Sequence, residues 1–354
     1  MKKKLAAVLV VVIIIVAAFA GYQLMNDTVF QYGDAKVSLP EATVYAKIQQ
    51  YSAESQYGSY FGEEMWTMEV EDGVTLEQSV KDNTIKQIKA VKVLNDHADD
   101  VKVSLTKEEK TQAEESAKVF MDSDEGKKII EQAKADEELI KTIYQENALA
   151  TKVKQAIVDK VDTKVTDEEA QIRTVYKLVF ATKKTDANGK VTELSDTEKA
   201  KQKKKAEKAY KALKKGADIT ALAKQYDVQD TVNESYGAGQ SAGGEKFEAA
   251  VAKLKKGKFT SVIEDEEGYV IAKLVTDNDK KKTEENKQTV LENRQNDAYQ
   301  KQYDKWAKNL EADWDDSKSI KKRLWNKVTF QYGELGSTEA STTEATTATT
   351  TTKK

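Results

Sequence analysis

Two runs of sequence, VYKLVF at residues 175–180 and GYVIAKL at residues 268–274, decide the fold of this 354-residue chain. Between them come a long Lys/Ala-rich stretch and four shorter motifs: GADI at 216–219, LAKQY at 222–226, FEAA at 247–250 and GKF at 257–259. The order of these segments predicts a first strand, two helices, a short helix and two closing strands.

This order of elements resembles a parvulin-type peptidyl-prolyl isomerase domain. The resemblance implies an antiparallel sheet wrapped by helices. The match runs from Arg173 to Asp277, and the ten residues between Gly257 and Gly268 fit the family's loop-and-strand spacing without a gap. The resemblance covers roughly a third of the chain. It implies a domain that binds polypeptide around a proline and rotates the bond before that proline.

Such a domain needs an apolar slot for the proline ring and a polar network beside the twisting carbonyl. Amide resonance sets a barrier near 18–20 kcal/mol, and an enzyme lowers it by binding the twisted amide better than either planar form. Family members build the network from two histidines and a cysteine or aspartate, and they line the slot with a Leu, a Met and a Phe. Carried over by resemblance, the two histidine positions fall on Tyr176 and Val270. The acid position falls near Gln229 and Asp230, and the slot phenylalanine falls on Phe247.

The remaining slot positions fall near Tyr236 and in SAGG at 241–244, so only Phe247 clearly keeps the family's residue type. In an extended strand Tyr176 points with Leu178 and Phe180, so Tyr176 and Val270 are alternatively plain core or sheet-face residues. The functional alternative is a Tyr176 hydroxyl beside a residual slot. Loss of one positioned polar group commonly costs on the order of 10²-fold in rate. No catalytic residue is assigned, and we expect weak or no isomerase activity from segment 168–278.

Bulk composition narrows the chemistry further. Charged residues make up 33% of the chain, yet the net charge is only −3, which argues against a dedicated nucleic-acid binder. There are no cysteines, so disulfides, thiolate metal sites and cysteine nucleophiles are excluded. His97 is the only histidine, which argues against zinc and Ser-His chemistry. We expect neither a metal nor a cofactor.

The N-terminus carries an export signal of one of two kinds. Three lysines at 2–4 precede an apolar stretch at 5–25, whose length of about 31 Å at ~1.5 Å per residue is enough to cross a bilayer. The lysines favour a cytoplasmic N-terminus and a single-pass anchor in the cell membrane, with the bulk of the chain outside. The alternative is a signal peptide cleaved after Ala20, which would give a secreted protein.

Several helices are expected on both sides of the parvulin-like block. Ser38 with Pro40 and Glu41 reads as a helix start. Capping boxes begin at Thr106 and Thr166, and the second lies at the expected domain boundary. An apolar stripe predicts one long helix across residues 129–157, and residues 56–73 read as an ordered loop.

The segment after the block begins another long helix at Thr283. Large side chains repeat along it at spacings of four, three, four and four, at Tyr299, Tyr303, Trp306, Leu310 and Trp314. Burial of each is worth about 1.5–3 kcal/mol, so we expect this stripe to dock on the N-terminal helices. The motif FQYG occurs at 30–33 and again at 330–333, and we predict that the two copies pair as neighbouring strands.

The predicted fold is therefore α+β, with a helical chaperone-like lobe built from both chain ends, an inserted parvulin-like domain and an N-terminal transmembrane segment. PrsA- and SurA-type foldases are similar. The expected domains are an anchor or signal peptide at 1–25, helical-lobe segments at 26–167 and 279–335, the parvulin-like domain at 168–278, and a disordered Thr-rich tail at 336–354.

Two further motifs have plain alternatives. Six lysines between Lys199 and Lys208 form a basic run on a predicted helix. This run is either a solvated helix face or a contact for anionic cell-envelope polymers or lipid headgroups. The glycines at 238–244 lack the Gly-Lys-Ser/Thr ending of a phosphate loop.

The resemblance implies an extracytoplasmic, membrane-tethered foldase or chaperone whose partners are unfolded secreted polypeptides. Tyr57, Tyr60, Phe61 and Trp66 are candidates for an apolar client-binding surface, or alternatively they fill the core of the lobe. The competing functions are an active isomerase with a divergent site and a structural envelope protein. We expect no nucleic-acid partner, and whether the chain forms a homodimer is left open.

Overall fold

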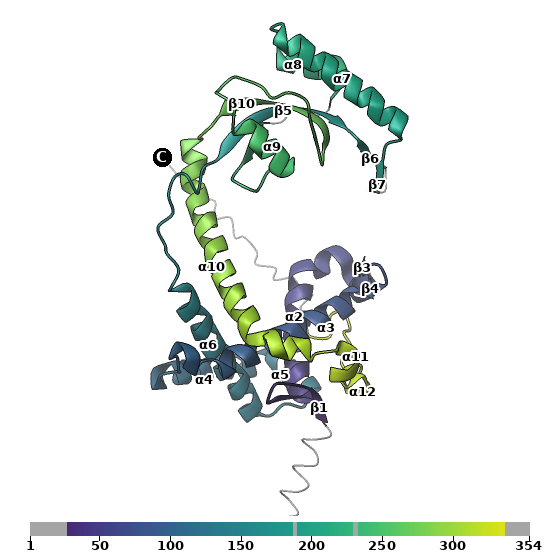
Figure 1. The fold of residues 1–354 in the computed structure, drawn as a ribbon. Coiled ribbons are helices and arrows are strands. Elements are labelled where there is room, and N and C mark those ends of the chain that lie inside the picture. Colours follow the sequence, from purple (N-terminus) through teal and green to yellow (C-terminus); the bar gives the residue numbers. More distant parts are fainter. Residues whose placement is uncertain (1–26, 187–189, 229–232, 337–354) are drawn as a thin grey trace, which may run out of the picture. The chain divides into compact units, whose positions relative to one another are not determined.

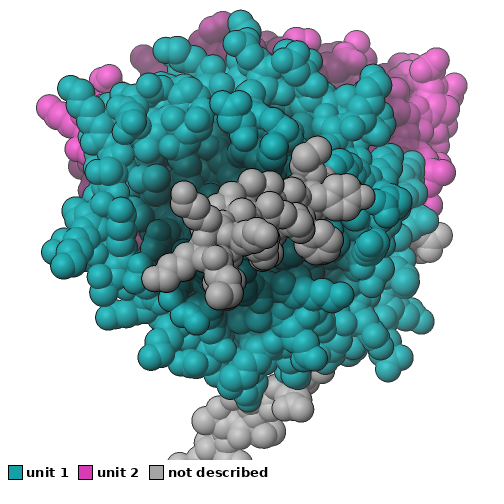
Figure 2. All heavy atoms as spheres, turned by 90° about the horizontal axis from the view of Figure 1, so that it is seen from below, with its two compact units in different colours: residues 1–160, 298–354 teal, residues 161–297 magenta. Residues whose placement is uncertain are grey.

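The computed structural model describes residues 27–186, 190–228 and 233–336. The chain divides into two compact units: unit 1 combines residues 1–160 with 298–354, and unit 2 comprises residues 161–297. The two units are coloured separately in Figure 2. The chain mixes helices and sheet, as expected from the sequence. The predicted N-terminal span at 5–25 and the tail beyond residue 336 lie outside the described residues. Within those residues, no helix combines the length and the apolar character needed to span a bilayer.

Unit 1 is mainly helical. Its elements are β1 (Thr28–Tyr32), β2 (Ala35–Ser38), α2 (Leu39–Phe61), the 3₁₀ helix Gly62–Thr67, β3 (Glu69–Glu71), β4 (Val74–Thr75), α3 (Leu76–Asp96), a second 3₁₀ helix (Asp99–Val101), α4 (Lys107–Asp122), α5 (Asp124–Ala133), α6 (Glu137–Val158), the end of α10 (Lys280–Ala312), α11 (Asp316–Ser319) and α12 (Lys322–Trp325).

The predicted helix starts are confirmed where side chains cap the backbone. Ser38 accepts a hydrogen bond from the Glu41 amide at the start of α2, with Pro40 in the first turn. Thr106 and Glu109 form a reciprocal capping box on α4. Such caps satisfy backbone amides that have no partner within the helix. Thr166 and Glu169 make the same reciprocal bonds, but the residues that follow form a turn rather than a helix.

Two predictions about the helices of this unit are wrong. Residues 56–61 are not a loop but the end of α2, which stops at Gly62 with φ 59°. Position 58 in this helix is a glycine, which leaves room for the ring of Tyr332, because a Cβ there would lie only 3.1 Å from that ring. The single helix expected across 129–157 is two helices, because Lys134 turns left-handed with φ 53° and Asp136 caps α6.

The core of unit 1 is built from both ends of the chain. Val29 and Phe30 from the N-terminal end pack in one cluster with Phe330 and Leu335 from the C-terminal end. The helix expected to start at Thr283 begins at Lys280 and is α10. Its aromatic stripe docks as predicted, with Tyr303, Trp306, Leu310 and Trp314 against the main cluster and Tyr299 against a smaller one.

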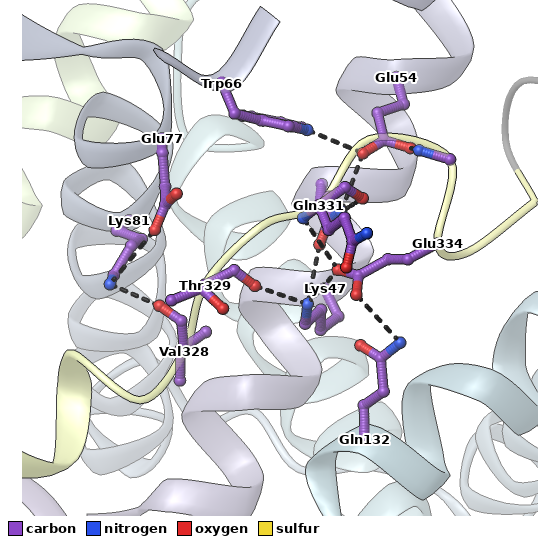
Figure 3. A network of polar contacts seen from close by, with 12 residues as sticks. Lys47, Glu54, Trp66, Glu77, Lys81, Gln132, Val328, Thr329, Gln331 and Glu334 are labelled. Carbon is purple, nitrogen blue, oxygen red and sulfur yellow. Dashed lines mark hydrogen bonds and ion pairs between the residues drawn. The ribbon is translucent and has the colours of Figure 1, made fainter. Parts of the chain in front are cut away.

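The two FQYG motifs do not pair with each other, so that prediction is wrong. β1 pairs with β2 in a hairpin, with Phe30 opposite Val37, and Gly33 takes the positive φ that the turn requires. In the second copy, the backbone forms hydrogen bonds with side chains of α2 instead of with another strand. Gln50 donates to the Gln331 carbonyl, and the Gly333 amide donates to Glu54 (Figure 3).

Unit 2 holds a four-stranded antiparallel sheet in the order β8-β5-β10-β9. Helices α7 and α8 cover one face and α9 covers the other (Figure 1). The elements of unit 2 are β5 (Arg173–Ala181), β6 (Lys183–Thr185), β7 (Val191–Glu193), α7 (Asp196–Lys214), α8 (Ile219–Tyr226), β8 (Asn233–Tyr236), α9 (Gly244–Val251), β9 (Ile263–Asp265), β10 (Gly268–Thr276) and the start of α10.

Candidate functional site

The sheet of unit 2 separates the residues predicted to form one site. Tyr176 lies with Leu178 and Phe180 on the face covered by α7 and α8. Val270 and Phe247, both 0% exposed, pack together on the opposite face under α9. Side chains alternate between the faces of a strand, so the structure does not bring Tyr176 to the other two. Gln229 and Asp230 lie outside the described residues.

The charged residue Lys177 of β5 faces Phe247, on the same side of the sheet as Val175, and it was not among the predicted site residues. Its ammonium lies 5.5 Å from the centre of the Phe247 ring, and the whole residue is only 7% exposed. It forms ion pairs with Glu234 on β8, at 2.6 Å, and with Glu267 in the turn before β10. The sequence signal was a single charged residue inside the apolar run VYKLVF.

The charge of Lys177 is held in place by its partners. Burial alone pulls the pKa of the Lys177 ammonium down, but the hydrogen bonds and charges of Glu234 and Glu267 outweigh burial and raise it above its usual value. Lys177 is therefore an ammonium at any physiological pH. One ammonium faces two carboxylates, so the cluster carries a small net negative charge.

Asp265, half-buried at the end of β9, adds a third carboxyl. Its Oδ1 accepts hydrogen bonds from the amides of Glu267 and Gly268, at 2.9 and 3.2 Å. Its Oδ2 is buried without a hydrogen-bond partner among the described residues. Burial, with the nearby charge of Glu267, raises the pKa of Asp265 to about 6, although the two backbone amides act in the opposite direction.

The loop between β8 and α9 is fastened by carboxylates. Glu248 accepts from the amides of Gly239 and Ser241, and Glu234 accepts from Ser241 and from the Ala242 amide. The amides that a phosphate-binding loop would present to a ligand are therefore used internally at Gly239, Ser241 and Ala242. This agrees with the sequence argument against a phosphate site in this loop.

Tyr176 lies beside a separate hollow on the other face. This cavity has a volume of about 290 Å³ and is lined by Tyr176, Ile219, Thr220, Lys273 and Leu274, among others. Tyr176 stands opposite Lys273 in the register of β5 with β10. The hollow is distinct from the cluster around Lys177, so a Tyr176 hydroxyl cannot reach a slot at Phe247.

The aromatic residues predicted as a client surface divide into two groups in unit 1. Tyr57, Tyr60 and Phe61, at the end of α2, are 45%, 81% and 46% exposed. Trp66 is 3% exposed, packs on Phe330 and donates its indole N–H to Glu54. Val70, in strand β3, is also open to solvent. Trp66 is a core residue.

Comparison with known proteins identifies the class of the sheet domain. Residues 178–277 match the family model "Rotamase: PPIC-type PPIASE domain". The resemblance to parvulin-type isomerases is thereby confirmed, and the chain carries a PPIC-type domain within unit 2.

The chain is similar to a PrsA foldase over about half of its length. It is 26% identical over 205 residues to the foldase protein PrsA of Clostridium tetani, covering 55% of this chain and 58% of that protein. The matched region thus spans less than two thirds of the relative. Among solved structures, the chain is similar to the peptidylprolyl isomerase PrsA of Bacillus cereus, with 19% identity, coverage of 86% of this chain and 99% of that one, and a TM-score of 0.40. It is also similar to PrsA of Bacillus subtilis, with 22% identity, coverage of 67% of this chain and 90% of that one, and a TM-score of 0.23.

Proposed function

We propose that this chain is an extracytoplasmic, membrane-tethered foldase that assists the folding of secreted proteins, and that its PPIC-type domain retains little isomerase activity. The family match at 178–277 and the similarity to a PrsA foldase support the foldase assignment. The observation that carries the second part is the closed ion-pair cluster of Lys177, Glu234 and Glu267 over Phe247.

The cluster is poorly suited to twisting an amide. An isomerase site needs polar groups that form better hydrogen bonds with the twisted amide than with the planar one. The Lys177 ammonium gives its donors to two carboxylates and faces a ring that is 0% exposed. A substrate carbonyl would have to break these ion pairs and open the Phe247 pocket before it gained any contact.

Client binding is assigned to the helical unit. Non-specific capture of unfolded chains uses exposed apolar surface rather than a defined pocket. Tyr57, Tyr60 and Phe61 supply such a surface on one turn and a half of α2. We assign the lobe to residues 26–167 and 279–335 and the parvulin-like domain to 168–278. This assignment is supported by the compact grouping of 1–160 with 298–354 and of 161–297.

Tethering is assigned to residues 1–25. Its support is the sequence alone, with three lysines ahead of an apolar stretch that is long enough to cross a bilayer. Fractionation of the producing cells, with and without residues 1–25, tests it. Release of the whole protein into the medium after cleavage at Ala20 would replace the anchor with a signal peptide.

The isomerase claim is tested with the purified full chain in detergent. A protease-coupled assay on a proline tetrapeptide should give a kcat/KM at least about 10²-fold below that of a two-histidine parvulin measured alongside. A rate within a few-fold of that reference enzyme would overturn the claim. In parallel, light scattering from an aggregating client should fall when the chain is added at an equimolar ratio, and no effect would remove the chaperone assignment.

A divergent active site is the second candidate, because the Lys177 ammonium lies 5.5 Å from the centre of the Phe247 ring. In that case the ammonium itself would donate to the substrate carbonyl. Lys177→Met would then abolish whatever rate the wild type shows, whereas Lys177→Arg would keep part of it. If both variants leave a low rate unchanged, the cluster is structural only.

A further inference from the structure

Helix α7 carries an unusual concentration of positive charge. Residues 196–215 contain nine lysines and three acidic residues, a net charge of +6, in a chain whose total is −3. The remainder of the chain is therefore clearly acidic. A local charge of opposite sign to the whole molecule marks a place where an anionic partner is attracted while the rest of the surface repels it.

Five of these lysines form one straight stripe. The buried side of α7 is marked by Ala206, Ala209 and Leu213, which pack on the sheet. Successive residues of an α-helix are 100° apart around its axis, so the face opposite to these three can be read from the sequence. That face carries five lysines at spacings of three, four, three and four residues: Lys201, Lys204, Lys208, Lys211 and Lys215. All five are exposed. From residue 201 to residue 215 the stripe covers fourteen helical steps, or about 21 Å.

The stripe is only partly compensated by acidic residues of α7: Glu198 lies three residues before Lys201, and Glu207 lies between Lys204 and Lys211. Lys199, on the flank, pairs with Glu193 at 2.7 Å, while Lys203 and Lys214 lie over the rings of Tyr269 and Tyr210. None of the five stripe lysines forms an ion pair within the part of the chain that the structure describes. Like charges three and four residues apart destabilise a helix, so the fold accepts a cost that an external anion would remove.

We propose that this stripe binds a linear, base-free polymer of phosphodiesters. A row of ammonium groups repeating about once per helical turn of ~5.4 Å matches a flexible chain that presents a phosphate at each repeat. The proposal goes beyond the foldase function and does not depend on it.

Two other anionic partners fit less well. A helix that lies in a lipid surface places large apolar side chains among its outward-facing lysines, but the apolar residues of α7 face the sheet. A site for single-stranded nucleic acid adds exposed aromatic rings on which bases stack. The one aromatic residue of α7, Tyr210, is partly buried and packs against the cluster around Leu213.

The test uses the full chain in detergent and fluorescently labelled poly(glycerol phosphate), with binding followed by anisotropy at several salt concentrations. The stripe variant changes Lys201, Lys204, Lys208, Lys211 and Lys215 to Gln. A charge-matched control changes five exposed lysines elsewhere to Gln: Lys107, Lys110, Lys301, Lys305 and Lys322. Changing the stripe to Arg instead keeps its charge.

The wild type should bind the polymer with an affinity that falls steeply as salt rises, since binding releases counterions. The stripe-to-Gln variant should bind at least about tenfold more weakly with a shallower salt dependence, while the control and the Arg variant should stay within about threefold of the wild type. Far-UV circular dichroism checks that α7 persists, because all five positions are exposed and Gln is a good helix former.

Three results would overturn the proposal. One is absence of polymer binding by the wild type, and another is equal weakening in the stripe and control variants. The third is stripe-dependent binding that is as tight or tighter for vesicles containing 30 mol% phosphatidylglycerol, or for single-stranded DNA of the same charge; this would make the stripe a membrane or nucleic-acid contact.

Discussion

Buried lysines serve different purposes in the two units. In unit 1, Lys47 and Lys81 donate to backbone carbonyls of the C-terminal segment, at Thr329 and Val328, 2.7 and 2.6 Å away (Figure 3). In unit 2, Lys177 contacts two carboxylates and an aromatic ring on one face of a sheet. The first arrangement holds a chain end in place, and the second occupies the face where the fold would build a polar network.

The difference shows how a buried charge should be interpreted. A lysine whose donors go to main-chain carbonyls, as at Lys47, which also pairs with Glu334, has few donors left for a ligand, and its loss leaves those carbonyls without a partner. A lysine between carboxylates could act on a ligand, but only if the ion pairs open. Stability and activity measurements together can therefore separate the two cases.

The largest effect is expected at Lys47. Lys47→Met removes donors to the Thr329 carbonyl, Gln50 and Glu334 at a buried position, so unit 1 should lose about 3–5 kcal/mol. All four tryptophans of the chain lie in unit 1, which makes urea unfolding followed by their fluorescence a selective measurement. The exposed neighbour variant Lys327→Met should change stability by less than about 0.5 kcal/mol. A similar loss in both variants would mean that Lys47 does not fasten the C-terminal segment.

Lys177→Met is expected to cost less, about 2–3 kcal/mol, because Glu234 and Glu267 are partly exposed and can be hydrated after the lysine is removed. Unit 2 has no tryptophan, so hydrogen exchange of the β5 and β10 amides should report the loss. The isomerase rate should not fall below its already low value. A stable variant that has lost a measurable rate would instead make Lys177 the working group of a divergent enzyme.

Asp265→Asn should stabilise unit 2 in a pH-dependent manner. Because folding raises the pKa of Asp265 to about 6, its stabilising contribution is complete below its unfolded value near 3.8 and is lost as pH rises through about 6. At pH 7 the ionised, half-buried carboxylate therefore costs on the order of 1–3 kcal/mol. Asn keeps an oxygen for the amides of Glu267 and Gly268 but carries no charge.

The measurement is the hydrogen-exchange protection of unit 2 in wild type and Asp265→Asn at pH 4 and pH 7. The advantage of the variant should appear at pH 7 and shrink towards zero at pH 4. Glu266→Gln, at the exposed neighbouring position, should change stability by less than about 0.5 kcal/mol at both pH values. An equal gain from Asp265→Asn at both pH values would rule out its ionisation as the cause.

Local signals predicted much of the fold. The caps at Ser38 and Thr106, the strands at 175–180 and 268–274 and the docking stripe of α10 depend on spacing within one segment, which sequence displays directly. The two FQYG motifs show the limit of such signals. Their letters are identical, but one copy turns at Gly33 into a hairpin and the other is bound by Gln50 and Glu54 of α2.

The candidate site was less predictable, for a geometric reason. A strand alternates its side chains with a period of two, so an error of one residue moves a prediction to the other face of the sheet. The resemblance placed a histidine position on Tyr176, whereas the register with β10 puts Lys177 beside Ala272 and on the face of Val270. Only the pairing of strands distant in sequence distinguishes these two positions.

The smallest effect on stability is expected from removing the exposed aromatic residues of α2, although this change should clearly weaken client binding by the helical unit. Changing Tyr57, Tyr60 and Phe61 to Ser removes an exposed apolar surface and should alter the unfolding free energy by at most about 1 kcal/mol. Suppression of client aggregation, measured by light scattering at an equimolar ratio, should fall by at least about half.

Trp66→Phe in the core provides the opposite control, because it should lower stability through loss of the hydrogen bond to Glu54 while leaving suppression intact under native conditions. If the triple variant suppresses aggregation as well as the wild type, clients do not bind at these three aromatic residues. The helical unit would then differ from the sheet domain in client binding only if another of its surfaces binds clients.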